Sequence, residues 1–136
     1  MKCKILFYTF LSFFIMPLSY ATESTDPKNA LSYEIYLFDA IKKFPEFRRK
    51  YKLQVEEDLD VYGWRKNSLT GGPGKAMNTG ATGNVVIYEM CRAKYCDTQR
   101  LTIIYNPVTN QLWRRFKISE DDLSPSPPEE IKKLFK

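Results

Sequence analysis

The sequence predicts an α+β fold: a small antiparallel β-sheet, arranged as a meander, with helices before it and a short C-terminal helix packed on it. Three runs rich in β-branched and aromatic residues, 85–90, 101–105 and 112–118, predict the strands. Apolar residues at helical spacing precede these runs, and a proline-rich segment leading into a helical pattern follows them. The sequence shows no internal repeat, so we expect a single domain.

The first 21 residues predict a signal peptide. Lys2 and Lys4 give a positive start, and residues 5–16 form an apolar run too short to span a bilayer comfortably. A proline ends the run, and small residues occupy the cleavage positions. We therefore expect cleavage after Ala21, export, and a mature domain 22–136 with no membrane attachment. An uncleaved membrane anchor is the alternative.

Composition excludes several classes of function. The formal net charge of +5 falls by the two charges of Lys2 and Lys4 to +3, and this mild excess does not predict a nucleic-acid partner. The chain has no histidine, which rules out hydrolysis by a Ser-His or Cys-His pair. We therefore expect neither an enzyme nor a cofactor.

One acidic cluster leaves an enzymatic alternative open. It consists of Glu56, Glu57, Asp58 and Asp60. Paired carboxylates are the catalytic groups of glycosidases, but adjacent acids in a polar stretch are usually just exposed. A carboxylate-only glycosidase therefore remains a remote possibility, and it requires these acids to line a pocket.

Two helices are expected ahead of the sheet. Asp26 and Pro27 have the N-cap and first-turn signature of a helix that ends near Lys43. The apolar stripe of this helix, expected to pack on the sheet, consists of Leu31, Ile35, Phe38 and Ile41. Pro45 then restarts the chain, and residues 46–51 predict a short second helix.

Two segments outside the three strands carry loop and turn signals. Glycine, asparagine and threonine dominate from 67 to 84, which indicates a long loop or a loose hairpin. Residues 119–124 are polar and acidic, and the prolines that follow exclude a strand. Ser126 and Glu129 then predict a capping box for a terminal helix, 128–135, with its apolar residues on the body of the protein.

A pair of cysteines brackets the connection between the first two strands. Only Cys91 and Cys96 survive processing, and an even pair in an exported chain predicts a disulfide. Because the ring is short, it stabilises the fold by only about 2 kcal/mol, and its main expected role is to make the loop rigid. The alternative, a reduced pair that binds metal, lacks the two further ligands of a structural zinc site. The ring is expected to present Arg92, Ala93, Lys94 and Tyr95.

A longer motif continues from the ring into the following strands. It reads Cys91, four residues, Cys96, two residues, Gln99-Arg100-Leu101, then Asn110-Gln111-Leu112 and Phe116. With Trp64 and Gly71-Gly72 upstream, this pattern resembles the inhibitor of vertebrate lysozyme (Ivy) family over about residues 64–118. Ivy proteins are periplasmic and push a disulfide-closed loop into the active-site cleft of c-type lysozyme. The family ring reads Cys-Lys-Pro-His-Asp-Cys, whereas here Ala93, Lys94 and Tyr95 replace its Pro, His and Asp.

The resemblance implies a periplasmic inhibitor of a peptidoglycan-cleaving enzyme, either a lysozyme or a lytic transglycosylase. Such enzymes keep carboxylates in their clefts, and the ring carries Arg92 and Lys94 with no acid between its cysteines. We expect Lys94 and Tyr95 to enter the target's cleft, Arg92 to contact its rim, and Gln99 and Arg100 to support the loop.

Three alternatives remain open at this stage. They are an immunity protein that neutralises a peptidoglycan-degrading toxin, a structural protein of the envelope and, remotely, the glycosidase considered above. Each predicts a different partner, and the resemblance also implies a possible homodimer, because Ivy proteins can dimerise.

Overall fold

The computed structural model describes residues 25–118 and 121–135, so the expected signal peptide and its cleavage site lie outside the described residues. Within them, a six-stranded antiparallel sheet has the order β1-β3-β4-β5-β6, and β2 pairs with the other part of β3. The strands are β1 Leu69–Gly71, β2 Lys75–Asn78, β3 Asn84–Arg92, β4 Arg100–Asn106, β5 Gln111–Lys117 and β6 Asp121–Ser124. The predicted α+β fold with a central meander, β3-β4-β5, is confirmed.

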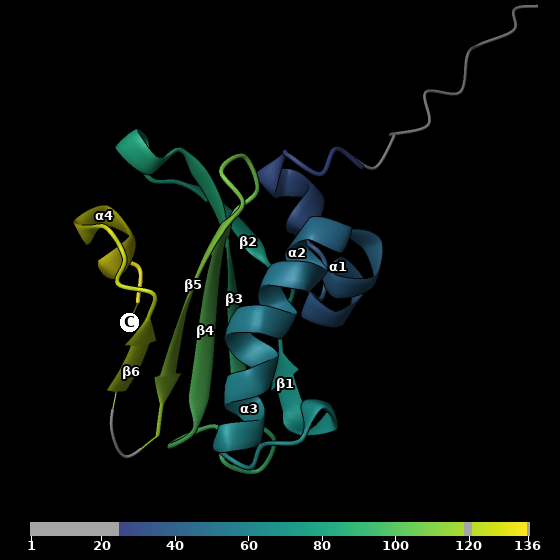
Figure 1. Ribbon diagram of the computed structural model, residues 1–136, viewed down its shortest axis with the longest axis vertical. Coiled ribbons are helices and arrows are strands. Elements are labelled where there is room, and N and C mark those ends of the chain that lie inside the picture. The colour runs from purple at the N-terminus through teal and green to yellow at the C-terminus, as the bar shows by residue number, and fades with distance from the viewer. Residues whose placement is uncertain (1–24, 119–120, 136) are drawn as a thin grey trace, which may run out of the picture.

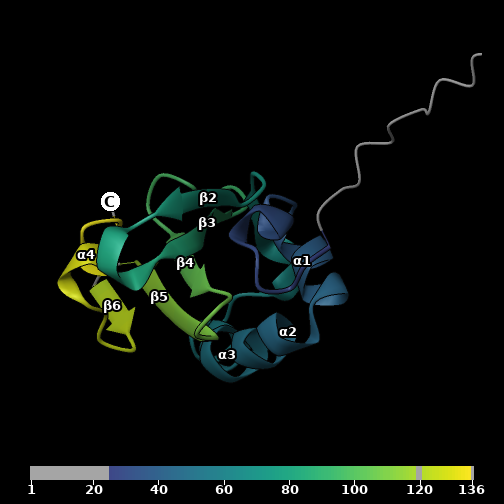
Figure 2. The same ribbon diagram turned by 90° about the horizontal axis from the view of Figure 1, so that it is seen from above.

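The helical elements flank this sheet. They are the 3₁₀ turn Ala30–Tyr33, α1 Leu37–Lys43, α2 Pro45–Tyr51, a π-helical turn Lys52–Glu56, α3 Glu57–Val61, two further 3₁₀ turns at Lys66–Ser68 and Gly80–Thr82, and α4 Glu129–Lys132. Helices α1, α2 and α3 lie on one side of the sheet and α4 lies on the other (Figures 1 and 2). No helix in the described ranges is long and apolar enough to cross a bilayer.

The larger core lies between α1–α3 and the sheet. Alternate residues of the three long strands point into it, and the helices contribute a row of aromatic rings. Tyr33 stacks on Phe44 with ring centroids 4.1 Å apart, and Phe47 lies 4.8 Å from Tyr105. Gly74 passes so close to this cluster that a Cβ there would lie 2.5 Å from the Tyr33 carbonyl oxygen. The face of the sheet toward the helices is therefore covered by closely packed side chains.

A smaller core lies on the opposite face, where α4 covers the end of the sheet farthest from the cysteines. It joins Val85, Ile104 and Trp113 of the sheet to Ile131 and Phe135. The expected C-terminal helix therefore packs on the body, although it is shorter than predicted. Its cap also differs: the N-cap is Pro128 and no side chain caps it, so the capping box of Ser126 and Glu129 is wrong.

The predicted first helix is broken in two. A 3₁₀ turn is followed by three non-helical residues, 34–36, before α1 begins at Leu37. Leu31, expected in the buried stripe, is 60% exposed. Long-range hydrogen bonds explain the break. The Tyr88 hydroxyl donates to the Tyr33 carbonyl at 2.7 Å, and the Gly74 amide donates to the Ile35 carbonyl at 3.0 Å. These bonds replace the helical ones that a continuous helix would make.

The second helix is longer than predicted. It starts at Pro45 as expected but continues through the π-helical turn into α3 and ends at Val61. The acidic cluster is therefore helical. Leu59 is buried within it, so one face of α3 packs against the core. Glu57 and Asp60 are exposed, whereas Glu56 and Asp58 are half-buried.

Three strands lie in the segment expected to be a long loop or a loose hairpin, 67–84, and in the segment expected to lack a strand, 119–124. Residues 67–84 hold β1 and β2, which pair one after the other along β3, with Gly72, Pro73 and Gly74 between them. Strand β6 occupies part of the polar stretch before the prolines and pairs with β5. Polar edge strands carry little hydrophobic alternation, which is why the sequence pattern missed them.

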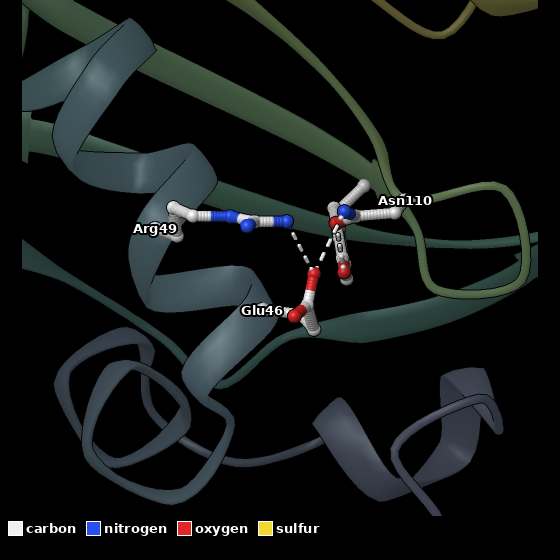
Figure 3. A network of polar contacts seen from close by, with 4 residues as sticks. Glu46, Arg49 and Asn110 are labelled. Atoms are coloured by element: carbon white, nitrogen blue, oxygen red, sulfur yellow. Dashed lines mark hydrogen bonds and ion pairs between the residues drawn. The ribbon is translucent and has the colours of Figure 1, made fainter.

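A polar network joins α2 to the β4–β5 turn at the end of the sheet away from the cysteines. Figure 3 shows the Glu46 carboxylate accepting hydrogen bonds from Arg49 at 2.8 Å and from Asn110 at 3.0 Å. The carboxamide oxygen of Asn110 accepts from the Tyr105 hydroxyl at 2.9 Å. Asn110 has φ +54°, a conformation that asparagine tolerates better than most residues. This network fixes the turn.

Candidate functional site

The cysteine ring sits at the β3–β4 connection. Cys91 and Cys96 form the predicted disulfide, with their Cα atoms 4.9 Å apart. Cys91 is still within β3 and pairs with Arg100, the first residue of β4. The ring is therefore a disulfide-closed loop that directly connects two central strands of the sheet.

Backbone hydrogen bonds hold the ring from both sides. The Ala93 amide donates to the Ser68 carbonyl at 2.6 Å, which ties the ring to the 3₁₀ turn before β1. The Tyr95 amide donates to the Arg92 carbonyl at 2.9 Å, and the Gln99 amide donates to the Tyr95 carbonyl at 2.8 Å. Together with the disulfide, these bonds fix the loop before it meets any partner.

The tip of the ring carries exposed side chains. Ala93, Lys94 and Tyr95 are exposed, Tyr95 by 47%. Lys94 has φ +73°, a left-handed conformation that turns the chain sharply at the tip. In the described residues, no salt bridge engages the Lys94 ammonium. A cation and an aromatic ring thus lie side by side in sequence at the end of a braced loop.

Arg92 lies against Tyr95. Its guanidinium carbon is 4.8 Å from the centre of the Tyr95 ring, and its terminal nitrogen donates to the Gln99 side-chain oxygen at 3.1 Å. Arg92 is half-buried, so its contacts brace the loop from inside. The expected contact of Arg92 with a target's rim stays a prediction.

Gln99 and Arg100, expected to support the loop, both contact it. Gln99 accepts the hydrogen bond from Arg92, and Arg100 Nε donates to the Cys96 carbonyl at 2.9 Å. The side chain of Arg100 therefore fixes the C-terminal cysteine, and that of Gln99 fixes the N-terminal half of the ring. Sequence reasoning missed the contact with Ser68, because nothing local in the sequence links residues 68 and 93.

The acidic cluster does not form a cleft of paired carboxylates. Asp58 binds Arg114 at 2.5 Å, whereas Glu57 and Asp60 are exposed. Within the ranges that the structure describes, none of these acids lines the grooves beside the disulfide, beside residues 97–98 or between β2 and α4. In the described part of the chain, no group of three or more Cys, Asp or Glu side chains is placed to hold a metal.

Arg114 is a structural residue that the sequence analysis did not single out. It occupies a position on the apolar face of β5 between Leu112 and Phe116, and it is 6% exposed. Its signal in the sequence is a charged residue at an apolar position of the alternating pattern. Its partners Gln54 and Asp58 lie in the π-helical turn and in α3, far earlier in the chain, so no local pattern reveals them.

Removal of the disulfide is expected to destabilise the fold only moderately. For the double variant Cys91→Ala, Cys96→Ala we expect the free energy of unfolding to fall by about 2 kcal/mol, because the closed ring is short. Urea unfolding of both proteins measures this difference. A loss above about 4 kcal/mol would show instead that the ring belongs to the folding core.

Comparison with protein-family models, with curated proteins and with solved structures finds no match to this chain. Its function is therefore inferred from the ring and its surroundings.

Proposed function

We propose that the protein is a periplasmic inhibitor of a peptidoglycan-cleaving enzyme, a lysozyme or a lytic transglycosylase, and that the ring enters the enzyme's active-site cleft. The observation that carries this proposal is the exposed pair Lys94 and Tyr95 at the tip of a disulfide-closed, hydrogen-bonded loop. The sequence resemblance to the Ivy family, described above, supports the same function.

The rigidity of the ring favours binding. A loop that is already ordered loses little conformational entropy when it docks, so more of its contact energy appears as affinity. The tip offers rigid aromatic area from Tyr95 and a positive charge from Lys94. Catalytic carboxylates in a cleft are complementary to that charge. Lys94 stands at the position of the histidine in the family's ring and supplies this positive charge.

An inhibition assay tests this proposal. Residual activity of c-type lysozyme and of a lytic transglycosylase is titrated with the oxidised mature protein and with the variant Lys94→Asn, Tyr95→Ala. Asparagine accepts the left-handed backbone of position 94, so the substitution removes charge without straining the loop. We expect inhibition of one enzyme by the parent protein and a loss of about 100-fold in affinity in the variant.

A matched control separates the ring from general surface effects. The variant Tyr36→Ala, Lys42→Ala removes an exposed tyrosine and an exposed lysine on or beside α1, and it should inhibit as the parent does. Equal loss in both variants would contradict a role for the ring. Absence of inhibition of either enzyme would exclude these targets and favour the second candidate, an immunity protein directed at a peptidoglycan-degrading toxin.

A further inference from the structure

A groove of about 430 Å³ opens on the sheet face that α4 leaves uncovered, directly beside the disulfide. Its lining consists of Glu89, Met90, Cys91, Cys96, Arg100, Thr102, Arg115 and Lys117. Two rows of cross-strand neighbours form its floor. One row holds Glu89, Thr102 and Arg115, and the other holds Cys91, Arg100 and Lys117.

The second row places two cations opposite each other. Arg100 and Lys117 are register partners on β4 and β5, so their side chains leave the sheet on the same face. Like charges directly opposite each other destabilise a sheet. Arg115, two residues before Lys117 on the same face, adds a third positive charge to the groove. An anion seated between the first two would remove this repulsion.

A hydrogen bond orients one of the two cations, and neither forms an ion pair with a described side chain. Arg100 uses Nε to bind the Cys96 carbonyl, which orients its guanidinium beside the ring. Among the described residues, no ion pair engages Arg100 or Lys117, and both side chains are exposed. The backbone of Asp121 pairs with Lys117 on its outer side. A second hollow, lined by residues 97, 98, 100, 117 and 118, shares the same two cations.

We propose that this groove binds a small carboxylate-bearing ligand, with the carboxylate between Arg100 and Lys117 and the Thr102 hydroxyl as a further donor. The disulfide forms one wall. The volume suits a ligand the size of a sugar acid. Glu89 lies in the adjacent row of the same groove, so a singly charged group is favoured over a more highly charged phosphate.

The site is distinct from the tip of the ring, because its cations lie on the sheet behind the disulfide. It can therefore be tested without any target enzyme. Amide shifts of the full mature protein are followed by NMR during titration with glucuronate, with glucose as the neutral match and inorganic phosphate as the second oxyanion, all at constant ionic strength. We expect saturable shifts with glucuronate that are confined to residues 89–102 and 115–117, with Kd of about millimolar.

Two lysine variants decide the assignment. Lys117→Met keeps the aliphatic stem and removes the charge, and it should weaken glucuronate binding about 5-fold. Lys133→Met removes an exposed lysine next to α4, outside this groove, and it should leave binding unchanged. Equal shifts with glucose, binding of phosphate as tight as that of glucuronate, or unaltered binding by Lys117→Met would each overturn the proposal. None of these outcomes bears on inhibition by the ring.

Discussion

Replacement of Arg114 by alanine is expected to lower the free energy of unfolding by about 3 kcal/mol. The Arg114 side chain is 7% exposed and reaches Asp58 at 2.5 Å, while its Nε donates to the Gln54 carbonyl at 2.9 Å. Its guanidinium also lies 5.0 Å from the centre of the Phe116 ring. Alanine would leave the carbonyl and the carboxylate without these contacts and would open a cavity. The Asp58 side chain is 30% exposed, so water would relieve part of the loss.

Urea unfolding measures this effect, and a neighbouring acid provides the control. Glu57→Gln changes an exposed carboxylate one residue before Asp58 and should shift stability by less than about 0.5 kcal/mol. Arg114→Met combined with Asp58→Asn fills the space with a neutral pair and should recover part of the loss. An Arg114→Ala variant as stable as Glu57→Gln would contradict a stabilising role for the buried arginine.

Alkaline unfolding is expected to begin above about pH 10. Burial raises the pKa of Tyr33, Tyr51, Tyr88 and Tyr105 above the ordinary value for tyrosine. The folded state thus favours the neutral phenols, whereas the unfolded chain ionises them from about pH 10 upward. Their contribution is complete below that pH and is lost as the pH rises toward the folded-state values. In this window each buried tyrosine should lower the free energy of unfolding by about 1.4 kcal/mol per pH unit.

Tyr51→Phe isolates one of these four groups. Within the described structure, the buried Tyr51 hydroxyl has no hydrogen-bond partner, so phenylalanine should not destabilise the protein at neutral pH. Between neutral pH and about pH 11, the free energy of unfolding of the variant should fall by about 1.4 kcal/mol less than that of the parent. Urea midpoints at the two pH values, with tyrosinate absorbance recorded in parallel, give this difference. Identical alkaline losses in both proteins would refute the assignment to burial.

The three long strands could be predicted because their signal is local. Val86 and Ile103 lie in runs rich in β-branched residues, and Phe116 alternates with charged neighbours. All three side chains are buried in the core between the sheet and α1–α3. The broken first helix could not be predicted in the same way. Its carbonyl groups bind Gly74 and the Tyr88 hydroxyl, which lie far along the chain, and these bonds outweigh the local preference for helix.

The ring itself was predictable, but its bracing was only partly so. Cysteine spacing indicated the disulfide, and the structure contains it. The stacking of Arg92 on Tyr95 and the bond from Ala93 to the Ser68 carbonyl depend on tertiary placement. The cationic row of Arg100 and Lys117 depends on strand register, which the sequence pattern did not define.

A double-mutant cycle between the ring and the inhibited enzyme tests the central claim most directly. Lys94→Asn in this protein is combined with Glu→Gln at the enzyme's catalytic carboxylate, and affinities of the four pairs are measured. If Lys94 enters the cleft, the coupling energy should be about 1.5 kcal/mol or more. A coupling energy near zero, with Lys94→Asn as tight as the parent, would contradict insertion of the ring.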